Sequence, residues 1–288
     1  MAITIGSKPM PLVGRRVYSA RMDRRTVLIG GLGLWAPRVR GAAPPPARLA
    51  AYLDSLRPIP AGAATLGAEA GENERPVRRA TFTAFRLGAT PVTVAMWREF
   101  AAASGVPMPE APEWGWIDDH PMVNVSWSDV CGDDGRGGYC GWASRVAGVA
   151  IQLPTEWQWE AAVRGGDSGA AFPWGDAFDI DRLWCSVKTR LESTASVGRT
   201  ESIHRNRYGL VDMSGNVWEW CRDAYREDPP SGLVDPAGPT RGASRCVRGG
   251  SWINGNPNNF RCAFRTGFPG TSREEYVGFR LCAPPRGA

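Results

Sequence analysis

The chain has little histidine: His120 and His204 are the only two among 288 residues. Neither stands in a Ser, His and Asp order that would support an activated nucleophile, so we interpret both as structural or surface residues. The chain also lacks a long basic run interleaved with aromatic residues. Its formal charge of +5 and pI near 9.0 therefore give no support for nucleic-acid binding.

Long hydrophobic runs are missing as well. The apolar stretch around Ile29–Ala36 is about ten residues long, too short to span a membrane. Arg24 and Arg25 precede it, which predicts a twin-arginine export signal over residues 1–43 and a periplasmic or secreted protein. A membrane-retained anchor or a disordered leader is the competing interpretation, and Met22 is an alternative start of translation. Residues 44–57 are expected to form a linker and a short helix.

The composition is rich in Gly (35), Pro (24) and Trp (13), which indicates one loop-rich unit with an aromatic core. Alternating apolar and polar residues predict a short strand before the middle of the chain, and the chain beyond Gly165 is expected to consist mostly of loops and short strands. Thr155 and Gln158 stand three apart, as in a capping box. The expected elements are helices over Arg48–Ser55, Thr93–Ser104, Ser126–Val146 (interrupted by the Gly-rich loop Gly132–Gly138) and Thr155–Ala162, and a strand over Ala80–Leu87.

The segment Gly209–Tyr225 combines acids, glycines and tryptophans within a few positions. Asp212 and Glu219 stand seven apart around a Gly-containing turn, so side-chain and backbone oxygens can converge on a hard cation such as Ca²⁺. The alternative is an ordinary turn with solvated acids and core Trp side chains.

This segment has companions in a fixed order along the chain. They are Gly62–Gly67, Glu74–Val77, Thr90–Thr93, His120–Trp127, Leu153–Glu160, Arg164–Gly166, Pro173–Gly175, Arg248–Trp252 and Gly278–Arg280. In this order and spacing they resemble the formylglycine-generating-enzyme (sulfatase-modifying factor) superfamily, from about Pro58 to Cys282. The resemblance implies an α+β, C-type-lectin-like, loop-rich fold for residues 58–288.

The resemblance also shows a departure. The family's founding enzyme oxidises a substrate Cys with a copper ion held by two Cys, whose positions are taken here by Asn254 and Asn259. An amide cannot replace a thiolate toward Cu(I), so formylglycine generation by that mechanism is not expected and any redox metal is unknown. Iron held by three His, as in the sulfoxide-synthase relatives, is excluded because the chain has two.

The family's calcium loop matches residue by residue. The resemblance implies that a structural Ca²⁺ is bound by the side chains of Asp212 and Glu219 and the carbonyls of Gly215 and Val217. Seven Cys fit an oxidising compartment. The resemblance favours a Cys140–Cys282 disulfide, Cys221–Cys246 is a second pairing, and Cys262 is left open because Val163 stands where its family partner would be.

The block from Gly250 to Arg280 is expected to form the exposed face that recognises a peptide or small-molecule ligand. Glu274 and Glu275, beside Tyr276, are the candidate acid and base. The candidate binding residues are Asn254, Asn256, Asn258, Asn259, Phe260, Arg261, Arg265 and Tyr276. The alternative is that Arg261, Arg265 and Arg280 are structural and bond loop carbonyls.

Three functions follow from the resemblance. The first is a periplasmic oxidoreductase-like maturation enzyme similar to the pyoverdine-maturation oxidases, which lack the copper Cys pair. The second is a non-catalytic ligand- or peptide-binding protein, including the variable proteins of diversity-generating retroelements. The third is an accessory factor that docks on an exported metalloenzyme. One scaffold hosts catalysts and binders alike, so the fold does not choose between them.

Overall fold

The computed structural model describes residues 46–133, 135, 137–186, 192–199, 205–227 and 234–287. The predicted export signal lies outside this part of the chain. From Ala43 onward the chain forms one compact unit. Its elements are α1 (Ala47–Asp54), β1 (Arg57–Ile59), β2 (Gly62–Leu66), η1 (Glu72–Glu74), β3 (Arg78–Phe82), β4 (Phe85–Leu87), α2 (Val94–Ser104), α3 (Trp127–Cys131), α4 (Gly138–Ala147), α5 (Glu156–Val163), η2 (Ile180–Arg182), β5 (Trp218–Ala224), β6 (Ser244–Arg248), η3 (Pro257–Phe260), β7 (Arg265–Pro269), β8 (Val277–Gly278) and β9 (Cys282–Ala283).

Side-chain caps begin the helices where the sequence predicted them. The Thr155 hydroxyl accepts the Gln158 N–H at 3.0 Å, and the Gln158 side chain accepts the Thr155 N–H at 2.9 Å. Ser126 and Asp129 form the same reciprocal pair at the start of α3. These caps satisfy backbone donors that have no partner inside the helix, which fixes the first residue of each helix.

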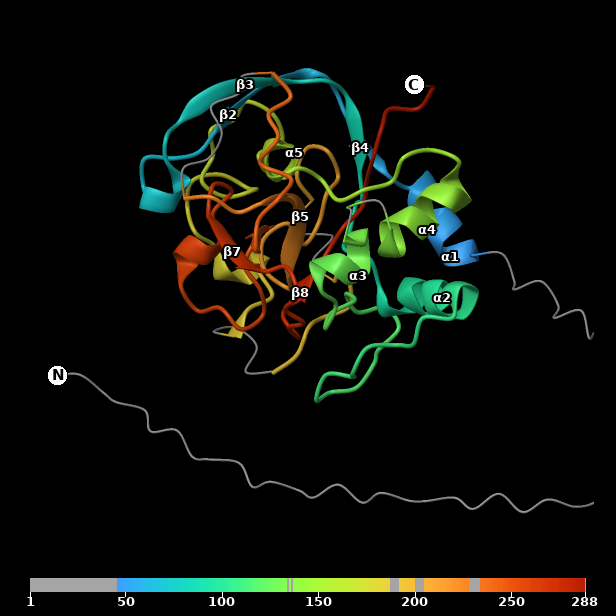
Figure 1. Ribbon diagram of the computed structural model, residues 1–288. Helices are drawn as coiled ribbons and strands as arrows, with labels where there is room; N and C mark the ends of the chain where they lie inside the picture. Colours follow the sequence, from blue (N-terminus) through green and yellow to red (C-terminus); the bar gives the residue numbers. More distant parts are fainter. Residues whose placement is uncertain are drawn as a thin grey trace, which may run out of the picture. The chain divides into compact units, whose positions relative to one another are not determined.

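The strands form three small sheets, with orders β1-β4-β9, β2-β3 and β7-β6-β5-β8. Only the β5/β8 contact is parallel among the pairs of named strands in the described chain. The single strand predicted over Ala80–Leu87 is instead two strands in different sheets. The break has a local cause: the Thr83 N–H donates to Asp235 Oδ1 at 2.7 Å, so the chain leaves its β2 partner there. Figure 1 shows β2 and β3 as a ribbon beside α5, with the four-stranded sheet below.

The main core is filled with aromatic rings, as the composition predicted. Trp97 and Tyr139 stack with ring centroids 5.3 Å apart, and Phe100 and Phe279 meet them edge-on. In Figure 1, α1, α2 and α4 lie together on one side of the molecule. The buried Leu49 and Tyr52 of α1 belong to this core, so the predicted linker segment contributes to the domain.

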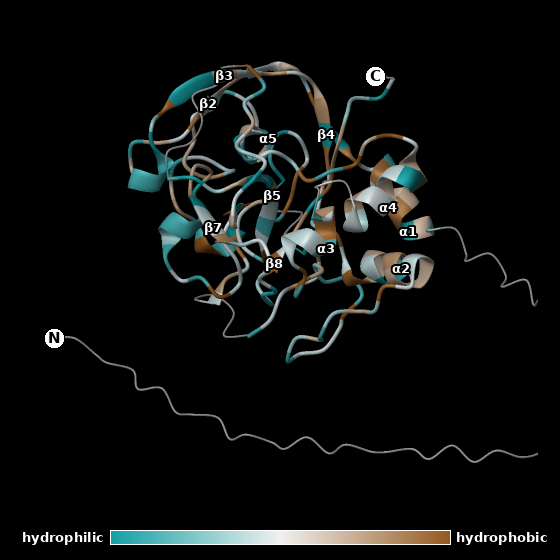
Figure 2. Cartoon of the chain, viewed as in Figure 1, coloured by the Kyte–Doolittle hydropathy of each residue, from teal (hydrophilic) through white to brown (hydrophobic). Residues whose placement is uncertain are grey.

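Strand β3 has an exposed polar side, where Arg79 and Thr81 alternate with the buried Ala80 and Phe82. Part of this strand is coloured as hydrophilic in Figure 2. None of the helices in the described chain has the length and hydrophobicity that crossing a bilayer requires. The arrangement is an α+β fold rich in loops, which agrees with the predicted fold class.

Candidate functional site

The predicted calcium loop is a turn with left-handed backbone at Asp212 (φ 54°), Gly215 (φ 84°) and Asn216 (φ 64°). A Cβ atom at Gly215 would lie 2.9 Å from the Trp184 carbonyl oxygen, so only Gly fits there. Asn216 Oδ1 accepts the Ala195 N–H at 3.0 Å. The Asp212 carboxylate accepts the Gly198 N–H at 2.7 Å. The turn is therefore fastened to the segment that precedes it in sequence.

Glu219, the second predicted acidic ligand, is buried against a cation of the protein itself. Its Oε1 accepts Arg280 Nη2 at 2.6 Å, and its Oε2 accepts Arg280 Nε at 2.7 Å. Oε2 also accepts the Trp159 Nε1–H at 2.7 Å. A calcium ion bound by Asp212, Glu219 and the carbonyls of Gly215 and Val217 would have to share Glu219 with Arg280. Calcium binding stays a prediction.

A second buried ion network joins α5 to the C-terminal strands. Arg248 Nη2 lies 2.5 Å from Glu160 Oε2, and Arg164 Nη2 lies 2.8 Å from Glu160 Oε1. Arg265 forms an ion pair with Glu156. Burial opposes ionisation of Glu156, but Arg248 and Arg265 outweigh it, so the pKa of Glu156 is lowered. Each of these three arginines and two glutamates faces at least one opposite charge, which is the condition for keeping charges in the core.

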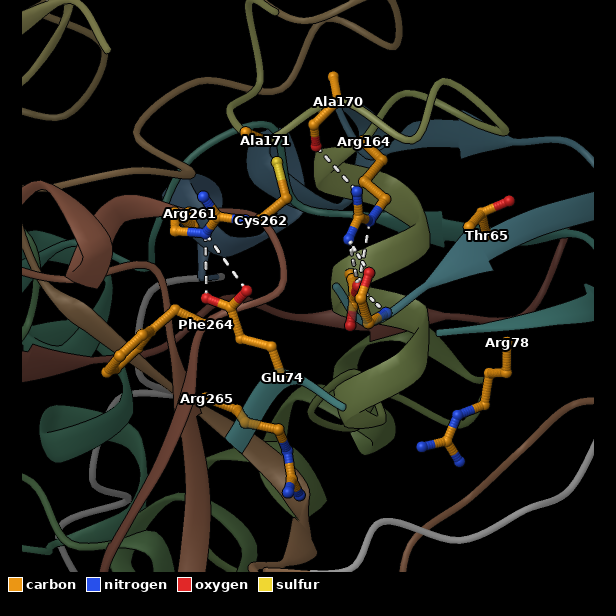
Figure 3. A network of polar contacts seen from close by, with 12 residues as sticks. Thr65, Glu74, Arg78, Arg164, Ala170, Ala171, Arg261, Cys262, Phe264 and Arg265 are labelled. Carbon is orange, nitrogen blue, oxygen red and sulfur yellow. Dashed lines mark hydrogen bonds and ion pairs between the residues drawn. The ribbon is translucent and has the colours of Figure 1, made fainter. Parts of the chain in front are cut away.

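Figure 3 shows how the predicted binding residue Arg261 is held. Its Nε donates to both oxygens of Glu74, at 3.1 and 3.2 Å. In the same view Arg164 reaches the Ala170 carbonyl, at 2.8 Å. The guanidinium groups of Arg261 and Arg265 are thus engaged by carboxylates inside the protein. This arrangement favours the structural alternative for both residues.

The asparagine-rich turn before η3 is also partly self-contained. Asn254 Oδ1 accepts the Ser251 N–H at 2.8 Å and the Ser251 hydroxyl at 3.0 Å. Asn256 Oδ1 accepts the Asn258 N–H at 3.0 Å and caps η3. The Phe260 side chain is buried, Asn259 is half-buried, and Asn258 is exposed. Asn256 and Asn258 are the exposed amides among the predicted residues, and the Asn256 side chain is engaged in capping η3, which makes Asn258 the better candidate to contact a ligand.

The predicted acids lie on a face that also contains residues distant in sequence. We call it the acidic aromatic face; its residues are Glu113, Trp114, Trp252, Glu274, Glu275 and Tyr276. The Trp114 and Trp252 rings meet edge-on with centroids 5.4 Å apart. Trp252 Nε1 donates to the Glu275 carbonyl at 3.1 Å.

The electrostatics of this face follow from crowding of acids. Partial burial, followed by the charges of Glu113 and Glu274, raises the pKa of Glu275. Burial and the neighbouring Glu274 likewise raise the pKa of Tyr276. Within the described residues, no group of three or more His, Cys, Asp or Glu side chains is placed to hold a metal ion. The face is therefore suited to proton transfer and to the binding of a polar or cationic group.

The sequence predictions gave no role to several acids that the structure brings into ion pairs or close to one another. Glu156 and Glu160 stand in the sequence only as part of a family motif, although they anchor the core network. Glu113 is not predicted, since nothing near it in sequence marks its proximity to Glu275.

The remaining polar candidates are less central. His120 Nδ1 lies 2.9 Å from Thr194 Oγ1, and burial lowers the pKa of His120. His204 lies outside the described residues.

Two cavities, of about 210 and 420 Å³, share Asp167 and Arg207 in their walls. None of the predicted site residues lines either cavity.

The architecture is shared with solved structures. PvdO from Pseudomonas aeruginosa superposes with a TM-score of 0.69 at 23% identity, over 80% of this chain and 94% of that protein. Treponema denticola variable protein 1 superposes with a TM-score of 0.64 at 22% identity, over 80% and 95%. These likenesses show that the chain shares the fold of these proteins.

Sequence comparison identifies the family. Residues 45–284 match the sulfatase-modifying factor enzyme 1-like domain, so the chain belongs to this family. It is 30% identical over 315 aligned positions to the formylglycine-generating enzyme of Streptomyces coelicolor, covering 84% of this chain and 95% of that enzyme. It is 34% identical over 213 positions to the inactive C-alpha-formylglycine-generating enzyme 2 of Mus musculus, covering 68% and 57%.

Proposed function

We propose that this chain is an exported maturation enzyme of the pyoverdine-oxidase type, which passes two hydrogens (two electrons and two protons) from a peptide or small polar substrate to an external electron acceptor such as dioxygen, without the copper-dithiolate mechanism. One observation carries the proposal. The family resemblance puts Asn254 and Asn259 at the positions of the copper Cys pair, and Asn254 Oδ1 accepts hydrogen bonds from the Ser251 N–H and hydroxyl. A neutral amide fixed in its own turn supplies no thiolate.

The acidic aromatic face supplies the chemistry of this proposal. Because its pKa is raised, Glu275 exchanges a proton closer to neutral pH than an ordinary Glu does. A phenolic or amide group of a substrate can rest on the Trp114 and Tyr276 side chains while Glu275 removes or returns its proton. The position of Glu275 on the same face as Trp114 and Tyr276 therefore fits a proton transfer that accompanies oxidation.

The test is to incubate the purified chain with dihydro-chromophore precursors and with phenolic peptides, with and without added metal ions. Loss of two hydrogens is followed by mass spectrometry. Glu275→Gln should slow the reaction at least about tenfold. Glu110→Gln, which alters an exposed acid nearby, is the matched control. Substrates left unchanged by the wild-type chain under all conditions would refute the enzyme proposal.

A binding protein is the second candidate, either one that holds a free ligand or an accessory factor docked on an exported metalloenzyme. It is favoured because the side chains of Arg261, Arg265 and Asn254 are hydrogen-bonded to other residues of the protein. The exposed residues that remain are suited to ligand recognition more than to catalysis. Ligand binding without turnover, weakened by Asn258→Ala, would support this candidate. Failure to retain any peptide or periplasmic partner would count against it.

Export and calcium are further parts of the proposal. Fusion of residues 1–43 to a folded reporter should direct it to the periplasm, and Arg24→Lys with Arg25→Lys should block this transport. Calcium should raise the unfolding midpoint of the chain, and Asp212→Asn should abolish the increase. An unchanged midpoint at millimolar calcium would remove calcium from the proposal.

A further inference from the structure

Two cysteines face each other across the central sheet. The register of β5 and β6 pairs Trp220 with Val247 and shifts between Trp220 and Ala224, so Cys221 and Cys246, the next residues on the two strands, lie side by side at this irregularity. Neighbouring strands of a sheet lie about 4.7–4.9 Å apart. A disulfide requires Cα atoms about 4.4–6.8 Å apart. The two thiols are hydrogen-bonded to each other and fully buried.

A second pair joins α3 to α4. Cys131 is the last residue of α3, and its carbonyl accepts the Gly137 N–H at 2.7 Å, just before α4 begins. Gly138 approaches α3 so closely that an added Cβ would meet the Asp129 carbonyl oxygen at 2.4 Å. In the first turn of α4, the Cys140 thiol is hydrogen-bonded to the Cys131 thiol.

We propose that these four cysteines form two disulfides, Cys131–Cys140 and Cys221–Cys246. This differs from the Cys140–Cys282 bond that the family resemblance favours. Cys282 lies on β9, where its sulfur is 3.8 Å from Gln158 Oε1. Cys282 also lies close enough to raise the pKa of the Cys140 thiol electrostatically, which makes Cys282 the competing partner for that thiol.

Each bond forms by thiol–disulfide exchange with an oxidant that itself carries a disulfide, such as oxidised glutathione. The two protein sulfurs join and lose two electrons, and the oxidant's S–S bond is reduced. The two thiol protons end on the two sulfurs released from the oxidant.

Burial determines when these bonds can form. All four side chains are almost inaccessible to solvent. Burial raises the pKa of Cys221 and Cys246, which reduces the thiolate that attacks an oxidant. The disulfides therefore form while the chain folds in an oxidising medium. A chain that folds under reducing conditions keeps its four thiols.

The test is peptide mapping of the full chain after it has been unfolded, reduced and refolded in a glutathione redox buffer. The product is unfolded again, alkylated and cleaved with trypsin. Arg136 separates Cys131 from Cys140, and Arg222 separates Cys221 from Cys246, so each disulfide links two distinct peptides. We expect both linked pairs, with Cys185, Cys262 and Cys282 alkylated.

Two variants sharpen the result. Cys246→Ser should leave Cys221 alkylated and the Cys131–Cys140 link intact. Cys262→Ser, a buried control, should leave both links in place. Seven alkylated cysteines, the absence of either linked pair, or a Cys140–Cys282 link in the wild-type chain would overturn the proposal.

Discussion

Glu219→Gln should destabilise this protein more than the loss of any surface ion pair. In the folded chain the Glu219 carboxylate accepts two hydrogen bonds from Arg280 and one from Trp159, and both charged side chains are almost fully buried. Gln has the same shape but no charge, and it replaces one acceptor oxygen with a donor. Arg280 then stays in the core as an uncompensated cation.

The size of the effect follows from that uncompensated charge. Breaking a buried ion pair from one side costs about 3–5 kcal/mol. In a domain of this size, about 1 kcal/mol corresponds to a midpoint change of about 2–4 °C. We therefore expect the thermal midpoint to fall by about 6–20 °C. Such a loss is a large part of the whole stability of a typical domain, about 5–15 kcal/mol.

The assay is thermal and urea unfolding followed by tryptophan fluorescence, in a chelator so that bound calcium does not contribute. Asp118→Asn is the control, because Asp118 pairs with Arg98 at 3.0 Å while both side chains are about half exposed. That change should cost less than about 1 kcal/mol. If Glu219→Gln lowers the midpoint no more than Asp118→Asn does, the Arg280 pair does not hold the core together and the reasoning is refuted.

Three further predictions concern acids and a cap. Burial raises the pKa of Asp223 from 3.8 to about 6, so the folded chain holds this proton more tightly than the unfolded chain. The free energy of unfolding should therefore be highest below about pH 4 and should fall by about 3 kcal/mol as pH rises through 6. Urea titrations from about pH 4 to 7 should show this slope, and its persistence in Asp223→Asn would disprove the assignment. As pH falls, ligand binding or turnover that needs ionised Glu275 should be lost at a higher pH than with an ordinary Glu, because the pKa of Glu275 is raised. A pH profile unchanged by Glu275→Gln would contradict this. Thr155→Ala should lower stability by about 1 kcal/mol in urea unfolding, and no change would show that the α5 cap is dispensable.

The helix starts could be predicted because they depend on residues close in sequence. Ser126 with Asp129 and Thr155 with Gln158 each act within one turn of the chain. The strand expected over Ala80–Leu87 was wrong as a single element for the opposite reason. Asp235 ends it near Thr83, and no local pattern reveals a partner about 150 residues away.

The sequence alone determined the family and the helix caps, because these depend on residue identity and short spacing. Tertiary structure decided what the charged side chains do. Only folding brings Glu74 to Arg261 and Glu113 to Glu275. Packing between distant segments places the Arg261 guanidinium against the buried Glu74 carboxylate. Packing and desolvation also leave Glu275 partly exposed near Glu113, with a raised pKa.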